Sequence, residues 1–231
     1  MLQLRKRGMK SSKIIVLFAA FFLASGASLL VYIFSGFSLL LSLVLAIAMI
    51  AVTWTIVWQK MDQTKQGYIK QRVKAGIVAG FLATAVYDLS RFALIKITGI
   101  HFWPFDIFDV FGKSLLGPSV EGWWVSAVGV GFHFLNGIAF GTSYAILFGT
   151  RGALAGVIWA LMLETLMVVA YPRWLTIKFM EEFLQVSIFG HIMYGTTLGY
   201  LAKKFIPLRP AERGFGGISL PTKRGEKMPR P

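Results

Sequence analysis

The sequence predicts an all-α membrane protein with six transmembrane helices, and three observations support this fold class. Of its 231 residues, 56% are hydrophobic and 15% are charged, which is too apolar for a soluble globular domain. Several uncharged runs approach or exceed the roughly 20 residues that a helix needs to cross the hydrocarbon core. Lysine and arginine gather in alternate connecting segments, as expected for a chain that crosses the membrane repeatedly.

The apolar runs predict where the spans lie. We place them at 14–34, 37–58, 75–98, 123–148, 152–171 and 183–202. The first run exceeds the about 7 to 15 apolar residues of a secretory signal, and a second run follows it directly. The chain then divides into a basic N-terminus at 1–13, a two-helix hairpin at 14–74, a four-helix core at 75–203 and a basic tail at 204–231. The prolines, glycines and charges of this tail predict disorder.

The positive charges predict the orientation. Six spans with both ends inside leave 19 of the 24 lysines and arginines on the cytoplasmic side: five before the first span, five at 60–74, Arg151, and eight from Lys203 onward. This asymmetry follows the positive-inside rule, so both termini and the 59–74 loop are expected in the cytoplasm. The net charge of +14 therefore needs no nucleic acid as a partner, and the basic flanks are expected to attract anionic lipid head groups.

An aromatic segment at 101–124 separates the third and fourth spans on the external side. Its Trp103, Trp123 and Trp124 are typical of the membrane–water interface, so a short helix lying in the interface is predicted there. A lid over a buried site is the alternative. We interpret His101, in the same segment, as an interfacial residue rather than a ligand.

The last four spans contain a duplicated pattern of glycine, acid and histidine. The equivalent pairs are Gly76 and Gly152, Gly80 and Gly156, Asp88 and Glu164, His133 and His191, Gly137 and Gly195, and Gly141 and Gly199. Each unit has two spans and re-enters the membrane in the same direction, which predicts parallel repeats related by a pseudo-two-fold axis along the membrane normal. The glycines have GxxxG spacing, which predicts close packing between helices.

Four ionisable side chains lie inside these predicted spans, namely Asp88, His133, Glu164 and His191. A charged group in the bilayer interior costs several kcal/mol, so residues at repeat-equivalent positions are better explained by a buried site than by chance. Counting from the span midpoints places all four within about one helical turn of the same depth. The predicted hydrogen-bond or ion-pair partners are Arg91, Asn136 and Tyr194.

Several interpretations of this buried site stay open. The four residues pair internally as structural elements, or they form a relay or ligand set in a conduit for protons, cations or small solutes. A third interpretation is a metal ion or haem, held by Asp88, His133, Glu164 and His191 or by the two histidines alone. A fourth is a non-catalytic subunit of a larger membrane complex, or a homo-oligomer, since the chain is short and its first two spans carry no interior charge. The conduit is the function we favour.

Cysteine is absent from the chain, which excludes disulfides, thiolate metal ligands and thiol nucleophiles. The sequence contains no nucleophile elbow, Walker loop, HExxH or Rossmann glycine pattern, so a familiar hydrolase or nucleotide enzyme is not predicted. The ExxH spacing of soluble di-iron bundles is also absent.

The helix pattern HxxxGxxxGxxY resembles a family of small uncharacterised prokaryotic membrane proteins with several spans. The first match runs through His133, Gly137, Gly141 and Tyr144, and the second through His191, Tyr194, Gly195 and Gly199. The resemblance covers about residues 75–203. It implies a compact bundle of membrane helices in a prokaryotic cell membrane and no established activity.

Overall fold

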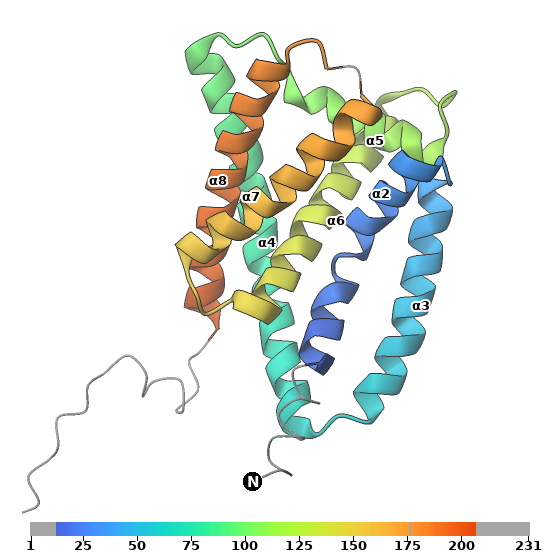
Figure 1. The fold of residues 1–231 in the computed structure, drawn as a ribbon, viewed down its shortest axis with the longest axis vertical. Helices are drawn as coiled ribbons and strands as arrows, with labels where there is room; N and C mark the ends of the chain where they lie inside the picture. The colour runs from blue at the N-terminus through green and yellow to red at the C-terminus, as the bar shows by residue number, and fades with distance from the viewer. Residues whose placement is uncertain (1–12, 176, 207–231) are drawn as a thin grey trace, which may run out of the picture.

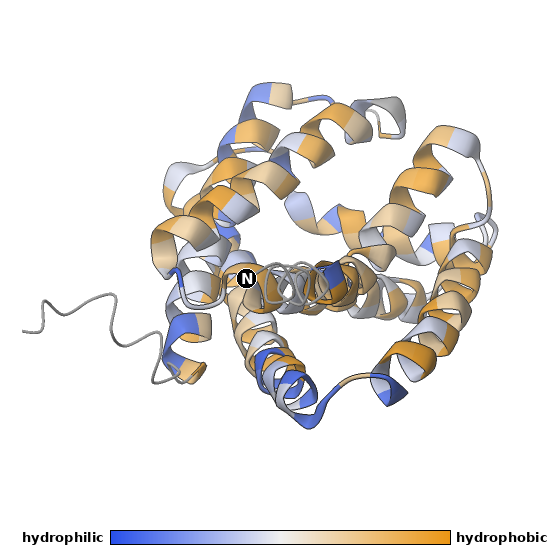
Figure 2. Ribbon diagram, turned by 60° about the horizontal axis from the view of Figure 1, so that its bottom comes forward, coloured by the Kyte–Doolittle hydropathy of each residue, from blue (hydrophilic) through white to orange (hydrophobic). Residues whose placement is uncertain are grey.

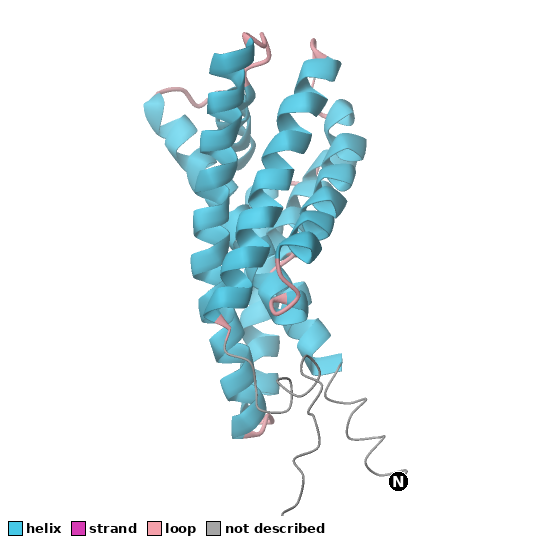
Figure 3. Cartoon of the chain, turned by 90° about the vertical axis from the view of Figure 1, so that its left-hand side faces the viewer, coloured by secondary structure: helices cyan, strands magenta, loops and turns pink. Residues whose placement is uncertain are grey.

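The computed structural model describes residues 13–175 and 177–206, and this part of the chain is helical with short connections (Figure 3). After a first helical segment at Lys13–Phe21, the elements are α2 (Ala24–Ser35), α3 (Leu39–Gln59), α4 (Gln63–Thr98), η1 (Pro104–Asp106), α5 (Ile107–Leu116), α6 (Trp123–Phe148), α7 (Ala153–Ala170), η2 (Tyr171–Arg173) and α8 (Met180–Phe205). The all-α prediction is confirmed for these residues. The predicted disordered tail and most of the basic N-terminus lie outside them.

Four of the described helices are long and apolar enough to cross a membrane: α3, α4, α6 and α7. The first helical segment and α2 together make a fifth candidate with a bend of 60°. At 26 residues α8 is long enough, but it contains no stretch apolar enough to be counted with these four. Hydrophilic residues gather where α3 connects to α4, at one end of the bundle (Figure 2).

The first predicted span, 14–34, corresponds to two helices that meet at a bend around Leu23. The residues that follow the break are small, and Gly26 lies against the ring of Phe140 on α6. A Cβ added at Gly26 would come within 2.5 Å of that ring. The bend therefore brings α2 into contact with α6, which a straight continuation of the first helical segment would not do. Gly36, in the left-handed conformation with φ of 69°, then ends α2.

The third predicted span is corrected, because α4 begins at Gln63 instead of residue 75 and is 36 residues long. The predicted loop at 59–74 is therefore mostly helix. Asp62 caps this extension by accepting a hydrogen bond of 2.9 Å from the backbone N–H of Lys65. The Lys65 side chain also bonds to Asp62, and these contacts lower the pKa of the carboxyl below its usual value.

The four core helices pack in the order α6, α4, α8, α7. In this order α4 packs along both α6 and α8, whereas α6 and α7 make few contacts with each other. In the predicted repeat, α4 corresponds to α7 and α6 to α8. A two-fold axis would therefore require α6 to pack on α7 as closely as α4 packs on α8. The units thus depart from the predicted pseudo-two-fold arrangement, and α2 contacts both helices on the side where they are apart.

The predicted glycine positions form close contacts between helices. A Cβ added at Gly76 would lie 2.5 Å from the Cα of Thr142, and one at Gly141 would lie 2.6 Å from the Cα of Gly80. On the other pair of helices, a Cβ at Gly156 would lie 2.1 Å from the carbonyl oxygen of Gly195. A side chain at these positions would therefore push two backbones apart. These close approaches join α4 to α6 and α7 to α8, as the GxxxG spacing predicts.

A short helix, α5, is confirmed within the aromatic segment 101–124, and it packs on protein. Residues Phe111 and Gly112 of α5 are buried. A Cβ added at Gly112 would lie 2.0 Å from the carbonyl oxygen of Val125, and one at Gly129 would lie 1.7 Å from that of Phe108. These close backbone contacts fix α5 against the start of α6 (Figure 1).

Candidate functional site

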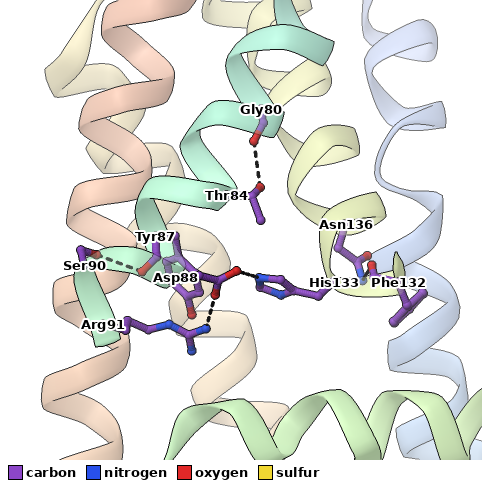
Figure 4. Close-up of polar contacts among 9 residues, drawn as sticks. All are labelled: Gly80, Thr84, Tyr87, Asp88, Ser90, Arg91, Phe132, His133 and Asn136. Carbon is purple, nitrogen blue, oxygen red and sulfur yellow. Dashed lines mark hydrogen bonds and ion pairs between the residues drawn. The ribbon is translucent and has the colours of Figure 1, made fainter. Parts of the chain in front are cut away.

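The first predicted acid and histidine form a direct contact between α4 and α6. Asp88 Oδ2 lies 3.1 Å from Nε2 of His133, and its Oδ1 accepts a hydrogen bond of 2.5 Å from Nη2 of Arg91 (Figure 4). Arg91 comes one turn after Asp88 on α4, which is the spacing that brings side chains together on a helix. The carboxylate thus has a fixed cation on one oxygen and an imidazole on the other.

Aromatic rings enclose the guanidinium of Arg91. Its central carbon lies 4.0 Å from the centroid of the Tyr87 ring and 5.2 Å from that of Phe105. The residue is 5% exposed, and its Nε has no hydrogen-bond partner. Asp88 therefore supplies the charge balance that a cation in this apolar setting needs.

The second predicted acid and histidine pair in the same way between α7 and α8. Glu164 is 3% exposed, and its Oε2 lies 2.9 Å from Nδ1 of His191. The same oxygen accepts a hydrogen bond of 2.9 Å from the hydroxyl of Ser187, whereas Oε1 has no partner. Nδ1 of His191 also lies 2.9 Å from the carbonyl oxygen of Ser187, one turn earlier on α8.

Tyr87 brings the two pairs together. The centroid of its ring lies 5.8 Å from that of His133 and 5.0 Å from that of His191. The two imidazole centroids are therefore no further apart than the sum of these distances, 10.8 Å. The predicted residues thus gather as two acid–histidine pairs that meet at one tyrosine ring. They do not form a single cluster.

The two pairs differ in charge. The position in α7 that matches Arg91 holds Met167, so Glu164 has no arginine one turn on. With ionised Asp88 and Arg91, the first pair is neutral when His133 is neutral. Ionised Glu164 with a neutral His191 has a charge of −1, so the second pair is neutral when it holds one additional proton. Because a net charge in an apolar interior is costly, the second pair is the one that needs a proton to balance it.

Two cavities meet at this site. The outer cavity has a volume of 460 Å³ and reaches residues of the connections before η1 and before α8, including His101 and Lys178. The inner cavity has a volume of 330 Å³ and lies where α6 and α7 are apart, with α2 as one wall. Both histidines line the inner cavity. The residues common to both cavities are Tyr87, Phe111, His133, Met167 and Tyr171.

Two tyrosine hydroxyls hold the helices together next to the inner cavity. Tyr194 donates a hydrogen bond of 2.6 Å to the carbonyl oxygen of Gly137, and Tyr144 donates one of 2.9 Å to that of Gly152. Tyr194 thus ties α8 to α6 instead of bonding directly to either acid. Asn136 donates to the carbonyl oxygen of Phe132 on its own helix, while its buried Oδ1 has no partner.

A metal does not fit the predicted ligands. In the described residues, no three side chains of histidine, aspartate and glutamate come together in a way that could hold a metal ion. The four predicted ligands are split into two pairs, and the Tyr87 ring lies against both imidazoles, where the face of a shared haem would need room. His101 is 78% exposed at its side chain and lies 3.5 Å from Glu182, away from both pairs.

Sequence reasoning missed Tyr87 and Ser187. Ser187 lies four residues before His191, a spacing that puts the two on one face of a helix, so this signal was available in the sequence. Its equivalent in the first unit is Gly129, which instead accommodates α5, so the duplicated pattern concealed it. Tyr87 has an aromatic side chain in a helix rich in apolar residues, and nothing in its spacing marks it.

No protein-family model, curated protein or solved structure matches the chain. The chemistry of the site is therefore argued from its own residues. Two acids, two imidazoles and a serine hydroxyl in two neighbouring pairs are groups that can accept, hold and pass protons. Among the described residues, the hydroxyl of Ser187 donates to the Glu164 carboxylate, and no hydrogen bond from it to an imidazole is observed.

Replacing Asp88 by Asn is expected to destabilise the fold by about 3 kcal/mol, because it leaves the buried Arg91 without a counter-charge. Glu164→Gln is the matched control. It removes a carboxylate with no arginine partner and is expected to cost about 1 kcal/mol. Unfolding in mixed detergent micelles measures both free energies. The double variant Asp88→Asn/Arg91→Gln should recover part of the first loss. Equal losses for the two single variants would contradict the ion-pair assignment.

Proposed function

We propose that the chain is an integral membrane protein with six spans and both termini in the cytoplasm, in the cell membrane of a prokaryote. The sixth span is α8. It packs between α4 and α7, and two of its polar residues, Ser187 and Tyr194, are buried against these neighbours. The basic flanks then lie where anionic lipid can bind them.

The four core helices are proposed to be a duplicated two-helix unit. Two features support this proposal: the acid–histidine contacts Asp88–His133 and Glu164–His191 occur at equivalent positions, and equivalent glycines form the close contacts in each unit. The unequal packing of α4 on α8 and of α6 on α7 means that the copies have diverged in how they assemble.

We infer that the protein is a proton-linked conduit for a small solute. The observation that carries this proposal is that two acid–histidine pairs contact one tyrosine ring, with both imidazoles lining one cavity. A pair of groups that only stabilised the fold would gain nothing from a cavity beside it. Groups that exchange protons with a passing solute require one.

The cavities suggest how such a conduit works. The outer cavity extends to exposed residues on the external side of the proposed topology, and the inner cavity continues from it past Tyr87 and His133. On the cytoplasmic side, glycine contacts and the fully buried Tyr144 and Leu198 close the bundle. This is the outward-facing state of an alternating-access cycle, in which the inner half would open next.

The topology is tested by a cysteine at Ser119, in the exposed connection before α6. Because the chain has no cysteine, a single introduced thiol is unambiguous. An impermeant thiol reagent applied to intact cells is expected to label Ser119→Cys. The matched control is Thr64→Cys, at the exposed start of α4. This cysteine should be labelled only after the cells are lysed. The reverse pattern would invert the orientation.

The conduit is tested by proton flux in liposomes that contain the purified protein and a pH-sensitive dye. A pH gradient is expected to drive flux in the wild type. Glu164→Gln is expected to reduce that flux to the level of protein-free liposomes, because the second pair can no longer hold its proton. The matched control is Glu181→Gln, an exposed residue at the start of α8, which should retain wild-type flux.

Two results would count against the conduit. Wild-type flux equal to that of protein-free liposomes, with and without added small solutes, would leave the pairs a structural role. Equal flux in Glu164→Gln and wild type would separate the transport path from this site. In the first case the proposal that remains is an accessory subunit, which co-purification of a membrane complex would identify.

A further inference from the structure

The outer cavity contains a buried cation with few partners. In the described part of the chain, Asp88 Oδ1 is the one hydrogen-bond acceptor within reach of the Arg91 guanidinium. A guanidinium carries five N–H donors, and it matches the two oxygens of a carboxylate particularly well. Arg91 lines the outer cavity and thus offers it a cation that water reaches poorly.

The lining of this cavity favours an anion with an apolar body. Arg91 and Lys178 contribute positive charge, and Asp106 is the one acidic residue among the described residues that line it. Aromatic and branched side chains form most of the remaining wall, including Phe102, Trp103 and Ile177. A volume of 460 Å³ is within the range of sites for small organic ligands, about 300–1,000 Å³.

Charge balance connects this cavity to a proton. In the empty site, Asp88 and Arg91 neutralise each other while His133 is neutral. An arriving carboxylate adds one negative charge, which a proton on the Asp88–His133 pair would offset. His133 lies 3.1 Å from Asp88 and also lines the cavity, so the proton would be held where the anion binds.

The ionisable groups that face this pair come from each neighbouring element. Beside His133 on α6 they are Asp106 on η1, Tyr171 on η2, the Glu164–His191 pair between α7 and α8, and, at the rim, His101 and Lys178. None of these lies within hydrogen-bond distance of Asp88 or Arg91. The proton that accompanies the anion is therefore assigned to the Asp88–His133 pair, which contacts Arg91 directly.

We propose that the outer cavity binds a small organic monocarboxylate at Arg91 and that binding takes one proton into the Asp88–His133 pair. This proposal rests on the proposed conduit and names its solute class. The solute enters as the anion, and the buffer acid or hydronium gives up the proton, so one of its bonds to hydrogen breaks as a bond to hydrogen forms on the Asp88–His133 pair. No bond between heavy atoms forms or breaks. The complex has the same net charge as the empty site, so a carboxylate can enter an apolar environment without an uncompensated charge.

Isothermal titration of the protein in nanodiscs of phosphatidylcholine tests this proposal, with benzoate as the probe. Benzamide is the matched control ligand because it has the same shape without the charge. Repeating the benzoate titration in two buffers of different ionisation enthalpy counts the protons taken up. The expected result is benzoate binding with uptake of about one proton at neutral pH and weaker binding of benzamide.

Variants identify the residues. Arg91→Gln is expected to weaken benzoate binding by about tenfold or more, as for a lost hydrogen bond to a charged group. Lys96→Gln, an exposed residue on the same helix, is the matched control and should bind like the wild type. His133→Gln should still bind benzoate but take up less than half the protons. If Arg91→Gln does not fold, the proton count of the His133→Gln variant still tests the proposal.

Other sources of the anion are separated by two further titrations. Inorganic phosphate tests a simple oxyanion site, and nanodiscs that contain phosphatidylglycerol test a lipid head group, which would compete with benzoate. Phosphate binding that exceeds benzoate binding, or strong competition by phosphatidylglycerol, would overturn the organic carboxylate assignment. So would equal binding of benzoate and benzamide, or unchanged binding by Arg91→Gln. Proton flux without benzoate binding would overturn this site alone, whereas binding without flux would overturn the conduit.

Discussion

A carboxylate buried among helices is stable only when its charge is balanced within a few ångströms, and this constraint organises the core. Asp88 and Glu164 each meet a histidine from the neighbouring helix, at 3.1 and 2.9 Å. Those contacts require the helices to be close, and glycines at the α4–α6 and α7–α8 crossings allow this approach. Charge pairing and glycine packing are thus two parts of one arrangement, since the pairs would separate if bulkier residues held the helices apart.

The departure from symmetry gives the protein its cavities. Two units related by an exact two-fold would pack α6 on α7 as tightly as α4 on α8. Instead, α6 and α7 are apart, the bent α2 leans across the gap, and the inner cavity occupies it. The charges depart from symmetry in the same way, since Arg91 has Met167 as its equivalent. One pair therefore has a fixed cation beside it and the other has none, and the proposed proton-linked cycle would use this difference.

The helical fold could be predicted from the sequence, because apolar runs depend on helix geometry alone. The spacing also placed the two acids and two histidines at a similar depth, but it did not predict which acid meets which histidine. The break at Leu23 could not be predicted, since it depends on the contact of Gly26 with Phe140, far along the chain. The start of α4 at Gln63 was missed because residues 63–74 are charged and lie beyond the apolar run. Tyr87 was missed for a similar reason: its role comes from two histidines on other helices, and no local pattern records that.

Histidine ¹⁵N magnetic resonance of the protein in membranes tests most directly whether the two pairs act as one site. The chain has three histidines, so His133→Gln, His191→Gln and a comparison with exposed His101 assign every signal. The account predicts hydrogen-bonded ring nitrogens at Nε2 of His133 and Nδ1 of His191. It also predicts that Glu164→Gln shifts both signals, because the Tyr87 ring contacts both imidazoles. A change at His191 with no change at His133, or signals that match those of His101, would contradict a shared site.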